Sequence, residues 1–496
     1  MADERPVVVI GAGPAGLAAA AELVTRDLPV LILERGDTAG AAVSEWGHVR
    51  LFSKWRDLVD PAAEKLLAVS GWRRPDDDGY PTGREWVEDY LAPLAEALGD
   101  RVRFGAEVTG VSRLGRDRVV DAGRAEQPFI VHVRTRDGQE RLSAHAVVDA
   151  SGTWRTPNPV GGDGLPALGE AAAAERISYR IPDLGEEKIR IRHAGRTTAV
   201  VGRGHSALTA LVALAAMAQE SPGTKAVWVL RRGEVGDAFG GGTADRLVER
   251  GALGRRARAA VEAGHVEVVT GFRTAQVRSV EDRLVLVGED GRELEPVDEI
   301  VALTGFRPDL SLLSEVRLGL DPTLQAPVEL APLIDPNRHS CGTVYPHGAA
   351  ELSHPEDGFF LAGMKSYGRA PTFLALTGYE QVRSIAAHLA GDHEGAARVE
   401  LVLPETGVCG GAGLFDDPTA TKADADGCCD PAPEAVREPA AEQGGCCGDL
   451  SVSEPPVLSR HESPTESSEE SVLTAESGCC SGPAQQVGPG EPGRIS

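Results

Sequence analysis

The stretch VVVIGAGPAGLAAAAEL, residues 7–23, decides the fold. Its apolar start predicts a β-strand, its alanine-rich end predicts a helix, and Gly11, Gly13 and Gly16 form G-x-G-x-x-G between them. In this motif the first glycine permits a tight turn, the second lets backbone amides approach a pyrophosphate, and the third lets the helix pack on the strand. The next strand, PVLILE, ends at Glu34, whose carboxylate can accept a hydrogen bond from a ribose hydroxyl. This complete context predicts a dinucleotide-binding module.

A second copy of the pattern lies in TTAVVGRGHSALTALVALA, residues 197–215. Its motif positions are Gly202, Gly204 and Ala207. The strand KAVWVL that follows leads into Arg231 and Arg232 instead of an acid. Two guanidinium groups suit the extra 2′-phosphate of NADPH, whereas the acid of the first module suits an unphosphorylated ribose. The alternative is that both arginines are merely solvated.

Three further segments complete the layout. AVVDASGTWRTPNP (146–159) and VDEIVALTGFRPDL (297–310) each run from an apolar strand into a turn, and we interpret them as the crossings between two nucleotide domains. Residues 357–392 predict a strand, a turn at Gly363 and an amphipathic helix. We therefore expect an α/β fold with two Rossmann-like domains. The expected parts are 1–155 and 300–395 for the first domain, 156–299 for the second, and a disordered acidic tail over 396–496.

The formal net charge of −25 argues against non-specific binding to nucleic acid or to anionic lipid, because both need basic patches. From Phe415 onward there are sixteen acidic and four basic residues, so about half of this charge belongs to the tail. The start MADERPVVVIGAG has no secretory pattern, and no run of 18 apolar residues follows. We expect a cytoplasmic protein without a membrane partner.

From about Asp416 the chain is rich in Glu, Asp, Pro, Gly and Ser, a composition that does not build a core. Six of the eight cysteines form three adjacent pairs there: Cys428 and Cys429, Cys446 and Cys447, Cys479 and Cys480. Reduced thiolates are soft metal ligands, so the pairs suit As(III) with two or three thiolates, or Hg(II) with two. Tetrahedral zinc needs two pairs together. The alternative is a cysteine-rich tail that only buffers metals or oxidants.

Over roughly residues 5–395 the chain resembles the two-dinucleotide-binding flavoproteins, and within them the class B flavin-containing monooxygenases. The resemblance implies FAD on Gly11, Gly13, Gly16, Glu34 and the Gly363 turn, and NADPH on Gly202, Gly204, Ser206, Ala207 and Arg231. Further expected cofactor-binding residues are Pro14, Ala15, Arg35, Val108, Gly152, His205, Arg232 and Gly305. The stretches GHSAL, RISYRIPDL, HSCGTVYPHG and LAGMKSYGRAPTFLALTGYEQVRS, with the cysteine pairs, resemble flavin monooxygenase-like proteins of bacterial arsenic-resistance operons.

The chain departs from the wider family in two ways. The monooxygenase signature F-x-G-x-x-x-H-x-x-x-[YFW] is missing between Pro159 and the second module, which puts hydroxylation chemistry in question. No C-x-x-C dithiol occurs in the body, so a disulfide reductase has no internal redox partner.

Candidate catalytic residues follow the Gly363 turn: Lys365, Tyr367 and Arg369. A cation there can polarise the flavin or hold an oxyanion, or it can cap local backbone and phosphates. Three hypotheses follow. The first is an FAD- and NADPH-dependent monooxygenase that uses O₂ on a small molecule in arsenic detoxification. The second is a reductase or oxidase that passes electrons to a thiol- or metalloid-bound substrate. The third is a metalloid-binding protein with a vestigial flavin domain.

Overall fold

The computed structural model describes residues 4–233, 235–242, 245, 247–337, 347–371 and 373–401. Of the expected tail over 396–496, residues 402–496, with the cysteine pairs, lie outside the described residues, whereas helix α11 (His393–Ala397) extends into its first two residues. Within the described part, the chain forms two five-stranded parallel sheets and two smaller antiparallel ones.

The first sheet has the strand order β15-β7-β1-β2-β3, and all of its neighbours pair in parallel. Its strands are β1 (Val7–Ile10), β2 (Val30–Leu33), β3 (Val102–Arg103), β7 (Ala146–Asp149) and β15 (Phe359–Leu361). We call the elements around this sheet the first lobe. Parallel strands end at the same edge, so the turns after β1, β2, β7 and β15 meet there.

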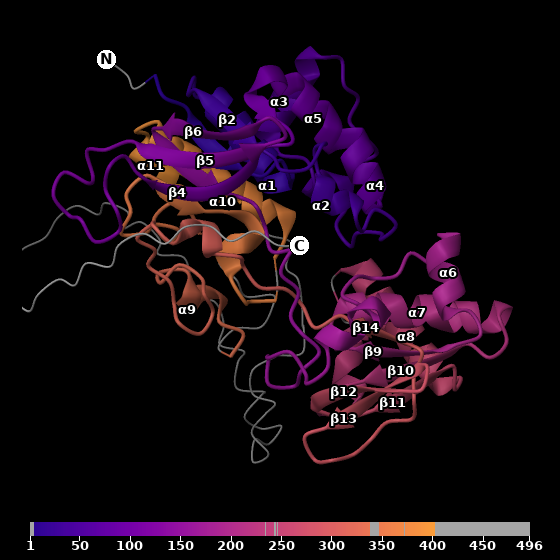
Figure 1. The fold of residues 1–496 in the computed structure, drawn as a ribbon. Helices are drawn as coiled ribbons and strands as arrows, with labels where there is room; N and C mark the ends of the chain where they lie inside the picture. The colour runs from indigo at the N-terminus through magenta and orange to yellow at the C-terminus, as the bar shows by residue number, and fades with distance from the viewer. Residues whose placement is uncertain are drawn as a thin grey trace, which may run out of the picture. The chain divides into compact units, whose positions relative to one another are not determined.

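Helix α1 (Pro14–Val24) packs closely because its inward face is alanine, and Ala18, Ala20 and Ala21 are completely buried. Figure 1 shows α10 (Ala375–Leu389, orange) beside α1 (indigo), so the two ends of the described chain share one lobe. Other elements of this lobe are α2 (Ala41–Ser44), α3 (Pro61–Val69), α4 (Gly83–Trp86), α5 (Ala92–Leu98), α9 (Ala331–Ile334), α11 (His393–Ala397), and the sheet β4 (Glu107–Arg113), β5 (Phe129–Thr135), β6 (Gly138–Ala144).

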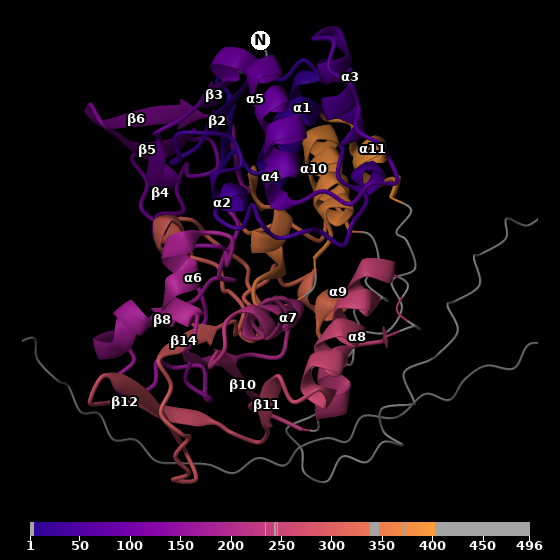
Figure 2. The same cartoon turned by 90° about the vertical axis from the view of Figure 1, so that its right-hand side faces the viewer.

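The second lobe is built on the parallel sheet β11-β10-β9-β14-β8. Its strands are β8 (Ile177–Ser178), β9 (Thr197–Val201), β10 (Lys225–Val229), β11 (Val266–Val269) and β14 (Glu299–Ala302). Figure 2 shows α7 (His205–Glu220) beside α8 (Val248–Glu262), with β10 and β11 next to them. Helix α6 (Glu187–His193) and the hairpin β12 (Thr274–Val280) and β13 (Arg283–Gly288) complete this lobe.

Short 3-10 or π turns link these elements. They are η1 (Trp55–Asp57), η2 (Val87–Leu91), η3 (Gly99–Arg101), η4 (Ala171–Arg176), η5 (Val235–Phe239), η7 (Ser311–Leu313) and η8 (Gly363–Tyr367). Within the part of the chain that the structure describes, no helix has the length and apolar character needed to cross a bilayer.

Asp60 caps α3 of the first lobe and is buried, and its carboxylate accepts a hydrogen bond from the Ala63 amide at 2.8 Å. Burial, and then the nearby charge of Glu22, raise its pKa from 3.8 to about 7. The native state therefore binds this proton more tightly than the unfolded chain. The contribution to stability is present at low pH and is lost as the pH rises from about 4 to about 7.

Asp60→Asn keeps an oxygen for the Ala63 amide but removes the titration. We expect the free energy of unfolding of the variant to exceed that of the wild type by a margin that grows between about pH 4 and pH 7. Urea unfolding of both proteins across this range measures the margin. Parallel pH profiles for the two proteins would contradict the assignment.

Candidate functional site

A cavity of about 900 Å³ opens at the edge where the strands of the first sheet end. Its wall includes the glycine loop after β1, the stretch 49–53, the turn after β7, the Gly363 turn and the first residues of α7. A single pocket of this size is at the upper end of the range for bound cofactors and small molecules. The cavity therefore has room for an extended ligand that reaches residues of both lobes.

Each of the three glycines of the first motif is required for a different physical reason. Gly11 has φ +100°, in the region that favours glycine, and a Cβ on Gly16 would lie 1.9 Å from the Gly11 carbonyl oxygen. Gly13 has an ordinary φ of −83°, and a Cβ there would meet no described protein atom within 4 Å. The fold thus requires Gly11 and Gly16, whereas Gly13 leaves space for a ligand to approach the backbone.

Helix α1 begins at this space with Pro14 at its first turn, and no side chain caps its free amides. These amides and the helix dipole favour an anion such as a pyrophosphate. Glu34 lines the same cavity, and its two oxygens accept hydrogen bonds from the Ala12 amide at 2.8 Å and the Gly36 amide at 2.7 Å. A carboxylate has about four acceptor positions, so Glu34 keeps capacity for ribose hydroxyls.

The remaining predicted cofactor-binding residues outside the second motif differ in where they lie. Pro14, Ala15, Arg35, Val108, Gly152 and Gly363 all line the cavity. Gly305 is not among the lining residues: its φ is +93°, and a Cβ on it would lie 3.3 Å from the side-chain nitrogen of Asn158. Glycine at position 305 is therefore needed for the turn of the second crossing, which passes close to Asn158.

Lys365 lies in the cavity wall and belongs to a buried charge network. Its ammonium donates to Asp149 Oδ2 at 2.6 Å and to Ser151 Oγ at 3.0 Å. The Ser151 hydroxyl in turn donates to Asp149 Oδ1 at 2.6 Å. The side chains of Lys365 and Asp149 are only 1% and 0% exposed. An ammonium has three donors, so one N–H of Lys365 remains for a ligand atom in the cavity.

The structure places Tyr367 and Arg369 away from the cavity wall. The ring of Tyr367 is buried and packs edge-on against Phe373, with ring centroids 4.9 Å apart, and burial raises its pKa. The guanidinium of Arg369 donates to Gln325 Oε1 at 2.8 Å. Of the three predicted catalytic side chains, only Lys365 lines the cavity.

The glycine motif of the second lobe repeats the geometry of the first. Gly202 has φ +137°, and a Cβ on it would lie 2.3 Å from the Leu303 carbonyl oxygen. Gly204 has φ −75°, and no described atom lies within 4 Å of a Cβ built there. Helix α7 starts at this space without a side-chain cap, and Ala207 is buried behind it. The second motif therefore offers the same kind of anion cradle.

His205 and Ser206 open α7 and line the cavity, so they connect the second motif with the first-lobe cavity. Burial, and then the nearby Arg250 guanidinium, lower the pKa of His205 to about 4. His205 is therefore neutral at physiological pH and cannot supply positive charge to a phosphate.

Arg231 and Arg232 follow β10, next to the second motif, and neither lines the cavity. The guanidinium of Arg231 donates to the Gly162 carbonyl at 2.9 Å. Arg231 is exposed and Arg232 is half-buried. Their position beside the β9–α7 turn is the one that recognises the 2′-position of a ribose in such folds.

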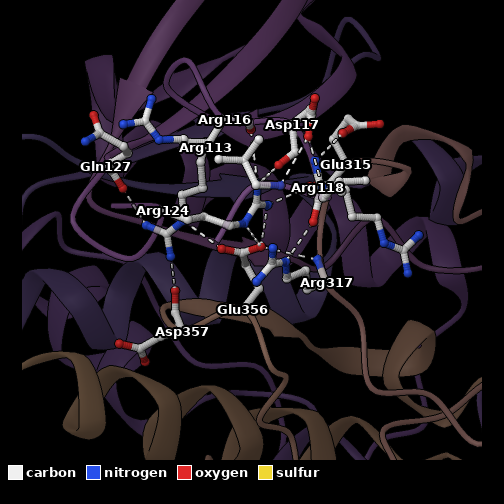
Figure 3. Close-up of polar contacts among 12 residues, drawn as sticks. Arg113, Arg116, Asp117, Arg118, Arg124, Gln127, Glu315, Arg317, Glu356 and Asp357 are labelled. Atoms are coloured by element: carbon white, nitrogen blue, oxygen red, sulfur yellow. Dashed lines mark hydrogen bonds and ion pairs between the residues drawn. The ribbon is translucent and has the colours of Figure 1, made fainter. Parts of the chain in front are cut away.

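A buried ion cluster, shown in Figure 3, supports the wall of the cavity near Ser311 and Leu312. Arg113 and Arg124 converge on Glu356, with shortest N–O distances of 2.8 and 2.6 Å. Burial alone would raise the pKa of Glu356, but the hydrogen bonds from Arg124 and Arg113 outweigh it and lower the pKa. Through Arg124, which also donates to the Glu315 carbonyl at 2.8 Å, the cluster fixes the segment after η7.

Two groups of residues at the site were not predicted. Asp149 and Ser151 lie in the quoted crossing DASG, but their partner Lys365 is more than 200 positions away in the sequence. Trp154 and Glu45, whose hydrogen bond fixes the first crossing, belong to no sequence motif that indicates a site. A strand that ends in an acid at the carboxyl edge of the sheet was the available signal for Asp149.

The six cysteines predicted to bind a metal, Cys428, Cys429, Cys446, Cys447, Cys479 and Cys480, lie outside the described residues. Among the residues that the structure does describe, no three His, Cys, Asp or Glu side chains gather as a metal site.

Comparison with known proteins gives one family and several relatives. Residues 8–329 match the pyridine nucleotide-disulphide oxidoreductase family. The indole-3-pyruvate monooxygenase YUCCA1 of Oryza sativa subsp. japonica is 30% identical over 203 residues, which are 40% of this chain and 43% of that protein. Ferredoxin–NADP reductase 1 of Cupriavidus necator is 27% identical over 307 residues, 60% of this chain and 70% of that protein.

Solved structures show the same fold. A bacillithiol disulfide reductase from Bacillus cereus is 20% identical, covers 78% of this chain and 99% of its own, and has a TM-score of 0.57. DfoA bound to FAD, the cadaverine monooxygenase of the desferrioxamine pathway from Erwinia amylovora, is 15% identical, covers 82% and 98%, and has a TM-score of 0.55.

Proposed function

The chain belongs to the pyridine nucleotide-disulphide oxidoreductase family, whose members combine FAD with a pyridine nucleotide, and from this premise we propose that it is an NADPH-dependent monooxygenase. In this reaction NADPH supplies two electrons, one atom of O₂ goes to a small soft nucleophile, and the other leaves as water. FAD supplies the electron exchange between the nicotinamide and oxygen. The activity of the rice relative, a monooxygenase, supports this reaction class.

The observation that carries the proposal is that none of the described residues in the cavity wall is a cysteine. The first cysteine of the sequence, Cys341, and all later ones lie outside the described residues. A disulfide reductase relays electrons through a dithiol next to its flavin. Because the described wall supplies no such dithiol, we propose O₂ or an external molecule as the electron acceptor.

The side chains of the cavity have distinct tasks in this proposal. Gly13 and the start of α1 bind the pyrophosphate, and Glu34 binds the ribose. Lys365 donates its remaining N–H to the cofactor from a fixed position. Trp46, Phe52 and Phe373 form apolar parts of the wall. Such walls exclude water, which strengthens every electrostatic interaction inside the site.

We expect Arg231 and Arg232 to set the preference for NADPH, because guanidinium groups recognise the 2′-phosphate. In Arg231→Ala/Arg232→Ala, kcat/KM for NADPH is expected to fall at least about 10-fold, since the loss of even one charge-assisted hydrogen bond costs about 1.5 to 3 kcal/mol. The value for NADH should stay unchanged. Steady-state kinetics with both nucleotides measures this, and an equal loss for both would contradict the assignment.

We propose that the substrate is trivalent arsenic. Support comes from the three cysteine pairs in the sequence, because soft thiolates capture this element. The test follows NADPH consumption, peroxide release and arsenate formation in air with increasing arsenite. A monooxygenase produces one arsenate for each NADPH, and peroxide release falls as arsenite rises. Peroxide release that equals NADPH consumption at every arsenite concentration would rule out oxygen transfer to this substrate.

A second candidate is an NADPH-dependent reductase that passes electrons to an external acceptor. The relative from Cupriavidus necator favours it, because the similarity covers 60% of this chain and that protein is a ferredoxin–NADP reductase. This candidate predicts rapid reduction of an added acceptor without oxygen and no oxygenated product in air. The same NADPH assay distinguishes the two functions when it is run under nitrogen with an artificial acceptor.

A further inference from the structure

Glu45, at the end of α2, joins the first lobe to the crossing and to the second lobe. Its carboxylate accepts a hydrogen bond from the Trp154 indole at 2.9 Å and forms ion pairs with Arg155 at 3.0 Å and Arg180 at 3.5 Å. Trp154 and Arg155 belong to the first crossing, whereas Arg180 follows β8 of the second lobe. One carboxylate thus connects three segments that are distant in the sequence.

The second crossing joins the same group through aromatic contacts. The Arg180 guanidinium lies 3.9 Å from the centre of the Trp154 ring and also donates to the Trp154 carbonyl at 3.0 Å. The ring of Trp154 meets Phe306 with centroids 4.9 Å apart. We call Glu45, Trp154, Arg155, Arg180 and Phe306 the hinge cluster, because both chain crossings between the lobes pass through it.

Two more contacts between the lobes come from the stretch after Glu45. His48 Nδ1 lies 3.8 Å from Asp183 Oδ2, and the Phe52 ring packs edge-on against His205 with centroids 5.5 Å apart. Phe52 and His205 also line the cavity. The stretch after Glu45, which contacts the second lobe, is therefore also part of the cavity wall.

We propose that the hinge cluster positions the nicotinamide lobe for hydride transfer, with Glu45 as its main positioning residue. This inference rests on the proposed reduction of FAD by NADPH. Hydride transfer needs the reacting atoms about 3 to 3.5 Å apart, and an error of about 1 Å can cost 100-fold in rate. Rotation of one lobe against the other about the two crossings would change this distance, and the ion pairs of Glu45 with Arg155 and Arg180 oppose such a rotation.

The first test is Glu45→Ala in the FAD-loaded protein. At saturating NADPH, without oxygen, the rate constant for flavin reduction is expected to fall about 10- to 100-fold. After chemical reduction with dithionite, the rate of reoxidation by O₂ should remain that of the wild type, because this half-reaction does not use the second lobe. Glu45→Gln keeps an acceptor for the Trp154 indole but loses the charge, and an intermediate rate is expected.

A matched control is Glu293→Ala, which removes an exposed ion pair between Glu293, in the segment after β13, and Arg278 of β12. It should change neither half-reaction. A Glu45→Ala protein that is reduced as fast as the wild type would overturn the proposal, and so would equal slowing of both half-reactions, which indicates general damage.

Hydrogen exchange of the FAD-free protein gives a readout that does not depend on turnover. In Glu45→Ala, the amides of residues 150–158 and 178–184 are expected to exchange faster than in the wild type and in the Glu293→Ala control. Unchanged exchange in both segments would contradict the proposed role of Glu45. If NADPH reduces neither the wild type nor the variant, the proposed function fails, while the exchange data still decide the role of the hinge cluster.

Discussion

Replacing Gly13 with alanine is expected to weaken FAD binding strongly and to leave the apoprotein as stable as the wild type. The backbone of Gly13 has φ −83°, which alanine adopts freely, and a Cβ there meets no described protein atom within 4 Å. The added methyl occupies the space through which a pyrophosphate reaches the amides of α1. We expect the FAD dissociation constant to rise about 100-fold or more, as when a ligand's charge-assisted hydrogen bonds to the backbone are lost together.

Fluorescence titration with FAD and thermal unfolding of the apoprotein measure the two effects separately. Gly110→Ala is the control, because a Cβ there has only an ordinary contact, 3.9 Å from the His132 side chain, and no ligand role. Gly16→Ala should differ from both, since its Cβ would lie 1.9 Å from a carbonyl oxygen and destabilise the apoprotein itself. Normal FAD affinity in Gly13→Ala would show that the pyrophosphate binds elsewhere.

The second large effect is expected for Lys365→Met. It leaves the completely buried carboxylate of Asp149 without its ammonium partner. Breaking a buried ion pair from one side typically costs about 3 to 5 kcal/mol in the free energy of unfolding. Urea unfolding of the apoprotein measures this loss.

The double variant Lys365→Met/Asp149→Asn separates stability from cofactor binding. Removing both charges should restore much of the lost stability, because no unpaired buried charge remains. FAD affinity should be lower than that of the wild type in both the single and the double variant, since both lack the N–H of Lys365 that faces the cavity. Recovery of both properties would mean that Lys365 only neutralises Asp149 and does not contact the cofactor.

Most of the fold that could be predicted from the sequence was predicted from the two glycine motifs. Each motif is a strand, a turn and a helix formed by residues that are adjacent in the sequence. Gly11, Gly16 and Glu34 therefore indicated the first lobe, and Gly202 indicated the second. The family match over residues 8–329 confirms the α/β oxidoreductase fold. The separate tasks of Gly13 and Gly11 became clear only from backbone angles and from the space around each Cβ.

Contacts between distant segments could not be predicted in the same way. The position of Lys365 just after Gly363 in the sequence predicts that it lies near the cofactor. Its ion pair with Asp149 could not be predicted, because it forms only when β15 pairs with β7. Tyr367 ends that 3-10 turn and Arg369 follows it, yet neither lines the cavity. Tyr367 packs on Phe373 and Arg369 binds Gln325, and these contacts depend on segments that the local sequence does not reveal. The hinge cluster joins residues 45, 154, 180 and 306, which no local pattern relates.

The most direct test of the central claim is rapid mixing of the FAD-loaded protein with NADPH in the absence of oxygen, followed through the visible absorbance of the flavin. We expect the absorbance to bleach in a single turnover, faster with NADPH than with NADH, and to return when oxygen is added. A flavin that neither nucleotide bleaches, although dithionite does, would contradict the claim that the second lobe delivers a nicotinamide to this cavity.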